Sequence, residues 1–301
     1  MKAQKEPEQI KRWILAARPK TLPAAASPVI VGTAVAIGEG LFNLGPALAA
    51  MMGALLLQIG ANLANDVFDY KKGADAGERL GPLRVTQAGL LTPRQVTRGM
   101  WLILGLAVVT GVYLALVGGW PIVVIGLLSI ASAIAYTGGP FPLGYHGLGD
   151  LFVFVFFGPA AVCGTYYVQA GELSEIAWWA AAPMGLLTMA ILAVNNLRDI
   201  ETDRAAGKKT LAVRFGVRGT RAEYLLLVGM AYLAPLAMWL ADVTTLWALL
   251  SWLSLPLALS PIRLVLQKRE RALNQALAQT ARLELIYGLL FSIGLIASGR
   301  L

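Results

Sequence analysis

The chain has 301 residues, of which 57% are hydrophobic and 14% charged, and its mean hydropathy is +0.65. Soluble domains carry roughly 25% charged residues, so this composition excludes an ordinary soluble protein and indicates an integral membrane protein. The alternation over roughly ten residues that is typical of membrane β-strands is absent, so we expect an all-α, polytopic fold. The net charge of +8 fits either an anionic partner such as nucleic acid or an orientation signal.

Apolar segments of bilayer-spanning length follow one another along the chain. A polar, basic segment, 1–20, comes first, and we expect it to lie in the cytoplasm. The first apolar segment is interrupted by Pro23 and Pro28, and the region before it is long for a signal peptide. The predicted spans lie at 21–37, 45–65, 99–118, 120–136, 149–169, 176–197, 223–241, 244–266 and 283–299. The sequence therefore predicts nine transmembrane helices in a single domain over residues 1–301.

The positions of the positive charges support this topology. Cytoplasmic loops of membrane proteins carry an excess of Lys and Arg. With nine spans and a cytoplasmic N-terminus, all 25 Lys and Arg residues except Arg300 fall on the cytoplasmic side. One span more or fewer would place the basic segments 71–98, 198–221 and 263–282 on opposite sides. Orientation thus accounts for the positive charge, and we expect no nucleic-acid partner.

Carboxylates and amides gather where the second predicted span ends. Asn62, Asp66 and Asp69 recur at i, i+4 and i+7, so a helix would present them on one face. Asn65 lies about one residue around from that face, and Asp75 follows in the loop. This stretch predicts a surface of hard oxygen ligands at a membrane edge.

A similar group ends the sixth predicted span. Asn195, Asp199 and Asp203 recur at i, i+4 and i+8, which again predicts one helical face at the cytoplasmic end. Four spans separate the two groups, so the chain could comprise two related four-helix halves and a ninth helix. That arrangement would turn both groups toward one cavity.

Acids at helix ends are often no more than solvated charges beside Lys and Arg. Five aspartates in two clusters at a membrane edge favour a ligand site instead, because ionisable groups there are costly and usually functional. A donor set of oxygen atoms alone suits Mg²⁺. The candidate metal ligands are Asp66, Asp69, Asp75, Asp199, Asp203, Asn62, Asn65 and Asn195.

Magnesium held by few carboxylates normally completes its shell with water and substrate phosphate. Basic residues that could neutralise a diphosphate are Lys72, Arg79, Arg84, Lys208 and Lys209. In a membrane cavity the economical diphosphate is that of a polyprenyl lipid, whose tail would lie among the helices. The predicted reaction is prenyl transfer, in which metal-assisted loss of diphosphate gives an allylic cation that apolar walls shield from water.

The two motifs resemble those of the UbiA superfamily of membrane prenyltransferases. They read Asn65-Asp66-x-x-Asp69, followed by Asp75, and Asp199-x-x-x-Asp203. The third acid departs from the family pattern, because it lies six residues beyond Asp69 instead of four. This longer form, together with RPKTLPAA (18–25) and RLGPLRVTQ (79–87), is similar to the branch that prenylates 1,4-dihydroxy-2-naphthoate in menaquinone synthesis.

The resemblance implies a nine-helix bundle around a central cavity. It implies that Asp66, Asp69, Asp199 and Asp203 act through Mg²⁺ on a polyprenyl diphosphate. The acceptor would be 1,4-dihydroxy-2-naphthoate, prenylated at the carbon bearing the carboxylate with loss of CO₂ to give a demethylmenaquinone. The implied location is the cytoplasmic (inner) membrane of a bacterium, with the site toward the cytoplasm.

Further candidates flank the two motifs. Tyr136 and Thr137 match family positions near the diphosphate, although Tyr136 suits an interfacial anchor equally well. Arg18 and Lys20 could meet the carboxylate of the acceptor or simply flank a span. The loop 136–150 has no basic residue and is rich in Gly and Pro, which suits a lid. Its His146 could relay a proton from the naphthol or be structural.

Two alternatives remain open at this point. A secondary transporter also needs acids in a polytopic bundle, but it predicts ionisable groups near the middle of spans, whereas the acids here fall at predicted helix ends. Within the enzyme class, the acceptor could be 4-hydroxybenzoate, homogentisate, a porphyrin or a lipid head group. These acceptors would keep the metal site and change only the acceptor pocket.

Overall fold

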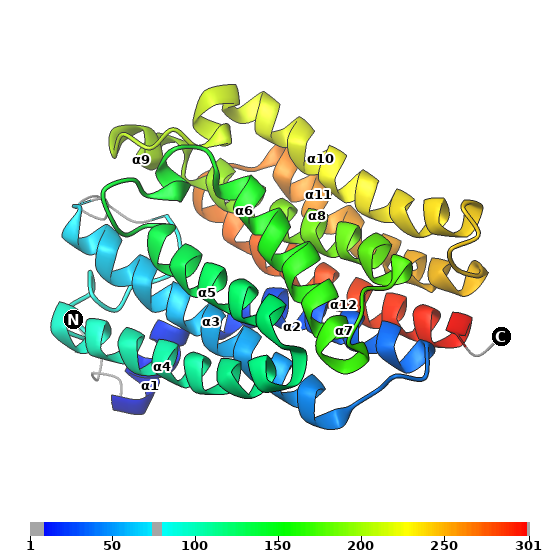
Figure 1. The fold of residues 1–301 in the computed structure, drawn as a ribbon. Helices are drawn as coiled ribbons and strands as arrows, with labels where there is room; N and C mark the ends of the chain where they lie inside the picture. The colour runs from blue at the N-terminus through cyan, green and yellow to red at the C-terminus, as the bar shows by residue number, and fades with distance from the viewer. Residues whose placement is uncertain (1–8, 74–79, 300–301) are drawn as a thin grey trace.

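The computed structural model describes residues 9–73 and 80–299, and this part of the chain contains helices and no strands (Figure 1). The predicted all-helical, polytopic fold is confirmed. The α-helices are α1 (Gln9–Ala17), α2 (Leu22–Gly38), α3 (Leu44–Lys71), α4 (Pro93–Gly118), α5 (Trp120–Ala135), α6 (Gly149–Val155), α7 (Ala161–Ala170), α8 (Glu175–Arg198), α9 (Ile200–Ala205), α10 (Leu211–Leu240), α11 (Leu255–Gln267) and α12 (Leu273–Gly299).

Within the described residues, 8 helical stretches are long and apolar enough to cross a membrane. The predicted span 120–136 forms α5, whose 16 residues give about 24 Å of rise, less than the roughly 30 Å of a bilayer core. Several helices run beyond their predicted spans at one end of the bundle: α3 continues to Lys71, and α12 begins at Leu273. Hydropathy marks only the part of a helix that lies in hydrocarbon, so it did not reveal these polar turns. For α3, the spacing of Asn62, Asp66 and Asp69 had predicted a helix that extends past the apolar segment.

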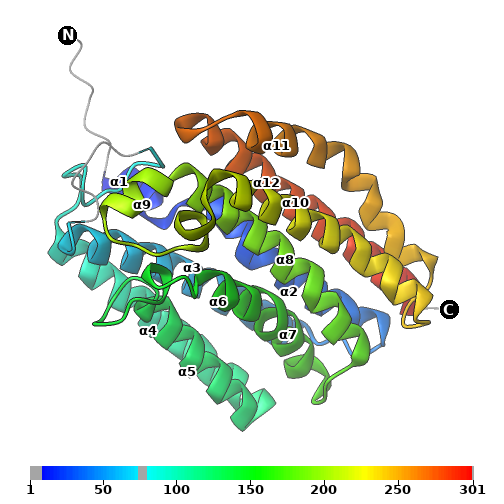
Figure 2. The same cartoon turned by 90° about the horizontal axis from the view of Figure 1, so that it is seen from above.

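The helices form two packed groups. Figure 2 shows α4 and α5 on one side of the molecule and α10 and α11 on the other, with α2, α3 and α8 between them. One group of buried apolar side chains joins α2, α7, α8, α10 and α12, and a smaller one joins α1, α3 and α4. The proposed relation between two four-helix halves stays a prediction.

Small residues permit close helix crossings, as is usual in membrane bundles. A Cβ atom added at Gly32 of α2 would lie 2.4 Å from the carbonyl oxygen of Val162 in α7. A π-helical segment, Phe156–Ala160, joins α6 to α7 and contains Pro159. Proline lacks the N–H that continues a helix, and the segment brings Phe156 and Phe157 to the cavity wall.

The helix α8 ends within the second acidic group, between Asn195 and Asp203. Asp199 has φ −99° and ψ 9°, and the chain then forms the separate short helix α9. The prediction that Asn195, Asp199 and Asp203 share one helical face is therefore wrong, because Asp203 lies on α9. The break changes the direction of the chain before Asp203. Asn195, Asp199 and Asp203 nevertheless all line the cavity.

Candidate active site

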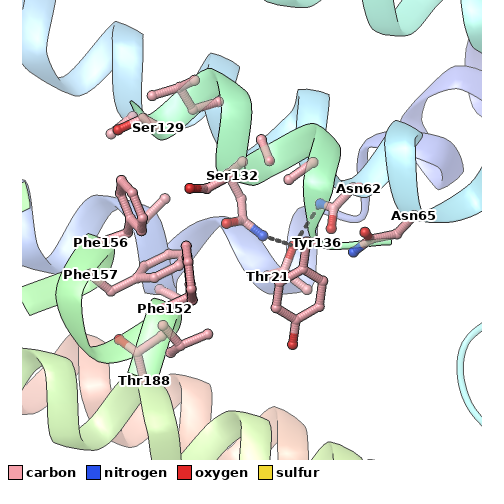
Figure 3. A pocket seen from close by; sticks show the side chains of 18 of the residues that line it. Thr21, Asn62, Asn65, Ser129, Ser132, Tyr136, Phe152, Phe156, Phe157 and Thr188 are labelled. Atoms are coloured by element: carbon pink, nitrogen blue, oxygen red, sulfur yellow. Dashed lines mark hydrogen bonds between the residues drawn. The ribbon is translucent and has the colours of Figure 1, made fainter. Parts of the chain in front are cut away.

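A cavity of about 840 Å³ extends through much of the bundle. Along α3 its wall runs from Ala50 to Asp69, which corresponds to about 28 Å of helix rise. Acids and amides line one end, and residues such as Leu114, Ile122 and Val168 line the other. Figure 3 shows Asn62, Asn65 and Tyr136 together on one part of the wall and Phe152, Phe156 and Phe157 on another. The cavity thus combines a polar head with a long apolar interior.

Asp69 occupies the last turn of α3 and contacts two partners. Its Oδ1 accepts a 2.7 Å hydrogen bond from the hydroxyl of Tyr145, and its Oδ2 pairs with Nη2 of Arg84 at 2.5 Å. The Tyr145 ring also faces the ammonium groups of Lys72 and Lys208, which lie 5.0 and 4.8 Å from its centroid. Tyr145 therefore brings one acid and two cations together. Sequence analysis missed it because the loop 136–150 carries no charged residue before Asp150.

Asp66 is placed differently from Asp69. It is 1% exposed, and its two carboxylate oxygens accept 3.1 Å hydrogen bonds from the backbone N–H groups of Val85 and Thr86. Arg18 Nη2 lies 3.9 Å from Oδ2. Asp66 is not among the residues that line the cavity. In this structure it secures the segment after α3, and its role as a metal ligand stays a prediction.

The asparagines of α3 hold neighbouring segments around the polar end. The amide nitrogen of Asn62 donates to the carbonyl of Ala17 at 3.0 Å and to Thr21 Oγ1 at 2.9 Å, the second bond being drawn in Figure 3. Asn65 Oδ1 accepts a 2.9 Å bond from Thr137. These bonds fix the chain entering α2 and the chain leaving α5 against α3. Both asparagines line the cavity, and their role as metal ligands stays a prediction.

Arg198, which sequence analysis did not select, organises the second acidic group. Its buried guanidinium donates to both carboxylate oxygens of Asp199 at 2.8 and 2.6 Å and to Asn195 Oδ1 at 2.7 Å. It also donates to Asn274 Oδ1 at 2.9 Å, and Asn274 in turn donates to the carbonyl of Leu80 at 2.7 Å. A guanidinium that donates to both oxygens of a carboxylate fixes the orientation of that carboxylate and also balances its charge. Arg198 therefore orients Asp199 and ties α8 to α12.

Asp203 and Lys208 form the third charged pair. Lys208 Nζ lies 3.1 Å from Asp203 Oδ1. Burial raises the pKa of Asp203, while Lys208 opposes the rise and the charges of Asp199 and Asp69 add to it. The three carboxylates thus belong to one electrostatic region although they come from α3, the end of α8 and α9.

Other predicted residues divide between the cavity and its surroundings. Arg18, Lys20, Arg84, Tyr136, Thr137 and Lys208 line the cavity. Lys72 is exposed and does not line the cavity, and its ammonium donates to the carbonyl of Thr137 at 2.7 Å. The Lys209 side chain is not part of the wall, and its backbone N–H donates to Tyr145 at 2.7 Å. Asp75 and Arg79 lie outside the described residues.

The structure does not place His146 at the cavity. Its ring stacks on Phe141 with centroids 3.7 Å apart, and its Nδ1 lies 2.9 Å from the carbonyl oxygen of Pro142. The carbonyl of His146 accepts a 2.9 Å bond from Arg214. The acceptor role considered for His146 has no support in this geometry, and the residue braces its loop. Of that loop, Tyr136, Thr137, Gly144 and Tyr145 border the cavity.

The donor set at the polar end suits a hard cation, since carboxylate and amide oxygens are what Mg²⁺ prefers. Among the residues that the structure describes, however, no group of three acidic, His or Cys side chains forms a ready metal site. Each acid instead pairs with a cation of this chain: Asp69 with Arg84, Asp199 with Arg198 and Asp203 with Lys208. A bound metal and diphosphate would have to share these charges between them.

Comparison with known proteins identifies the family of the chain. The model of the UbiA prenyltransferase family matches residues 25–286. The chain is 40% identical over 302 residues to the 1,4-dihydroxy-2-naphthoate octaprenyltransferase of Escherichia coli (strain K12). The aligned region covers 97% of this chain and 98% of that protein.

Solved structures share the fold. The apo structure of a UbiA homolog from Aeropyrum pernix K1 matches with a TM-score of 0.69 and 18% identity over 91% of this chain and 97% of that one. A UbiA homolog from Archaeoglobus fulgidus bound to GPP and Mg²⁺ matches with a TM-score of 0.63 and 14% identity over 94% of this chain and 100% of that one. The family model covers most of the chain, so this membrane protein belongs to the UbiA prenyltransferase family.

Proposed function

We propose that the chain transfers a polyprenyl group from polyprenyl diphosphate to 1,4-dihydroxy-2-naphthoate, with Mg²⁺, and releases CO₂ and diphosphate to give a demethylmenaquinone in its reduced, quinol form. The observation that carries the proposal is the cavity itself, in which Asp69, Asp199 and Asp203 line the head of an otherwise apolar space. The relative from Escherichia coli is named for octaprenyl transfer to this acceptor. Such a cavity accommodates a charged head and a long hydrocarbon tail in one molecule.

The acids and amides at the polar end would hold the metal with the donor. Asp69, Asp199 and Asp203 are the preferred ligands, assisted by Asn65 and Asn195, because all five line the cavity. Bound Mg²⁺ would supply positive charge to the diphosphate as it leaves. The homolog from Archaeoglobus fulgidus was solved with GPP and Mg²⁺, which supports the use of Mg²⁺ with a prenyl diphosphate.

The cations of the chain would act on the same leaving group. Arg84 and Lys208 line the cavity and now pair with Asp69 and Asp203. When diphosphate binds, its oxygens would compete for these cations, and the acids would be released toward the metal. Cations already positioned where negative charge develops stabilise departure without reorganisation of solvent. Arg198 would keep Asp199 and Asn195 in place during this exchange.

The bond changes follow from the acceptor. The C–O bond between the prenyl group and diphosphate breaks, and a C–C bond forms at the ring carbon bearing the carboxylate. The carboxylate then leaves as CO₂ and returns its electron pair to the ring, which restores the aromatic dihydroxynaphthalene. The product is therefore the quinol, and no external oxidant or reductant is needed to form it. Phe152, Phe156 and Phe157 on the wall would exclude water from the allylic cation. Arg18 and Lys20, which also line the cavity, would attract the carboxylate before reaction.

The chain would work in the cytoplasmic membrane of a bacterium with the polar end toward the cytoplasm. The supporting argument is the distribution of Lys and Arg, which gather at that end of the helices.

The test uses the purified full chain in detergent with octaprenyl diphosphate, Mg²⁺ and 1,4-dihydroxy-2-naphthoate labelled in its carboxyl group. We expect the label to leave as CO₂ in equal amount to the diphosphate released, chelation to stop turnover, and added Mg²⁺ to restore it. Retention of label in the prenylated product would overturn the decarboxylative reaction. Turnover of 4-hydroxybenzoate or homogentisate alone would overturn the acceptor, and turnover that persists after chelation would overturn the metal assignment.

A further inference from the structure

Glu284 is an acid in the interior of a membrane helix, away from the polar end of the cavity. It lies within α12, eleven residues after the helix begins, and its exposure is 0%. The ninth span was predicted to begin at residue 283, which would have placed Glu284 at a helix end. The structure places it in the interior of the helix because α12 begins at Leu273. Charged residues within membrane helices are costly and usually functional.

Glu284 contacts the cavity through one side chain. Its Oε1 lies 2.7 Å from Oγ1 of Thr188 in α8, and Thr188 lines the cavity, where Figure 3 shows it near Phe152. The other carboxyl oxygen, Oε2, has no hydrogen-bond partner among the described residues. Nothing in this arrangement is used by the diphosphate site.

The hydrogens available to Thr188 define what it can bind. Oγ1 also lies 3.0 Å from the carbonyl oxygen of Met184, which accepts only. One hydroxyl hydrogen cannot serve both Met184 and Glu284. Both bonds form together when Thr188 donates to Met184 and a protonated Glu284 donates to Thr188. Protonation of Glu284 also avoids a buried, charged carboxylate with too few hydrogen-bond partners. The remaining lone pair of Oγ1 is then free to accept a hydrogen bond from a group in the cavity.

The position of Thr188 suits the acceptor ring. Asn195 and Thr188 both line the cavity from α8, and seven residues correspond to about 10 Å of rise. A bicyclic ring placed next to the diphosphate would reach from one to the other. In 1,4-dihydroxy-2-naphthoate the 1-hydroxyl is adjacent to the carboxylate and can bond to it internally. The 4-hydroxyl lies across the ring and remains available to the protein.

We propose that Thr188, held by Glu284, accepts a hydrogen bond from the 4-hydroxyl of the acceptor and so selects a dihydroxy aromatic acid over a monohydroxy one. The inference rests on the proposed function and adds a residue that determines its specificity. Thr188 touches the acceptor, whereas Glu284 positions Thr188. Sites that bond a substrate hydroxyl in a buried setting discriminate strongly against analogues that lack it.

The experiment compares two ligands in the full-length enzyme. The first is 1,4-dihydroxy-2-naphthoate, measured by KM and kcat, and the second is 1-hydroxy-2-naphthoate, measured as a competitive inhibitor. The wild type should bind the dihydroxy acid about tenfold more tightly than the analogue, the typical effect of one hydrogen bond. Thr188→Val should remove this preference by raising KM for the dihydroxy acid, with the inhibition constant of the analogue within twofold of wild type.

Further variants separate recognition from folding. Thr188→Ser and Glu284→Gln should keep the preference, because a serine hydroxyl or a glutamine amide can make the same bonds. Glu284→Leu should reduce it. Thr110→Val is the matched control, since Thr110 of α4 makes a similar bond to Leu106 and does not line the cavity.

Equal binding of the two ligands by the wild type would overturn the inference, as would equal losses for both ligands in Thr188→Val. Failure of the wild type to prenylate the dihydroxy acid would instead overturn the proposed function. The inhibition constant of the analogue is obtained only from a wild type that turns over the dihydroxy acid, so absence of turnover and equal binding of the two ligands are distinct results.

Discussion

The hydroxyl of Tyr145 donates a hydrogen bond of 2.7 Å to Oδ1 of Asp69. This contact joins the loop after α5 to the last turn of α3, 76 residues apart in sequence. Asp69 is thereby oriented from one side by Tyr145 and from the other by Arg84. A neutral residue in a loop without charged side chains thus supports one of the three acids that we propose as preferred metal ligands.

Tyr145→Phe should impair catalysis without unfolding the protein. The change removes the bond to Asp69 and keeps the ring that faces Lys72 and Lys208. A lost hydrogen bond to a charged group is worth about 1.5–3 kcal/mol, so we expect kcat/KM for polyprenyl diphosphate to fall by about ten- to a hundredfold. Initial rates at varied donor concentration measure it. Tyr113→Phe on α4, outside the cavity wall, is the control, and equal rates for both variants would contradict the role of Tyr145.

Asp66→Asn and Asp69→Asn should differ in their effects on melting temperature. Asp66 accepts two backbone hydrogen bonds, and an amide retains only one accepting oxygen. We expect Asp66→Asn to lower the melting temperature and, through the displaced segment, the activity. Asp69→Asn should lower activity at least as much with little change in melting temperature.

Thermal melting in detergent and turnover at saturating Mg²⁺ test this difference. Asp242→Asn is the control, because Asp242 has φ 55° and asparagine tolerates that conformation. A melting temperature unchanged in Asp66→Asn would show that its two backbone bonds are not stabilising.

Arg198→Lys should be severe although the charge is kept. A lysine cannot reproduce the fork that contacts Asp199, Asn195 and Asn274. We expect a loss of at least about 2 kcal/mol in the free energy of unfolding, because buried polar partners are left unpaired, and a large fall in kcat. Arg204→Lys, in an exposed pair with Glu201, should change neither quantity appreciably. A mild effect at both positions would remove Arg198 from its organising role.

Gly32→Ala tests the helix crossing in the core. The new Cβ atom would lie 2.4 Å from the carbonyl oxygen of Val162, a backbone atom that cannot rotate away. We expect a cost of about 1–3 kcal/mol, seen as a lower melting temperature. Gly105→Ala in α4 meets no atom within 4 Å and should be neutral or slightly stabilising. Equal melting temperatures would mean that α2 and α7 can separate without cost.

The orientation can be tested by thiol labelling, because the only cysteine, Cys163, is buried. We expect Glu201→Cys to react with a membrane-impermeant reagent in inside-out vesicles and Ala241→Cys to react in intact spheroplasts. Glu201 lies near the polar end of the cavity, and Ala241 follows α10 at the opposite end. The reverse pattern would invert the assigned topology.

The sequence by itself determined the class of fold, the family and the polar end of the site. Hydropathy marks segments that must satisfy their backbone within the bilayer, and this requirement is local enough to read without a structure. The two acidic motifs identified the family for the same reason, since each is a short segment with its own spacing. Asp69, Asp199 and Asp203 were found in this way, and all three line the cavity.

Only the tertiary structure decided which of these residues face the cavity and which groups support them. Asp66 and Asp69 are three residues apart, yet one bonds the backbone of Val85 and Thr86 and the other lines the cavity. Arg198, Tyr145 and the pair formed by Thr188 and Glu284 act through contacts between segments distant in sequence. Spacing along one helix cannot reveal such contacts, because they depend on how helices pack and where a helix ends, as α8 does at Asp199.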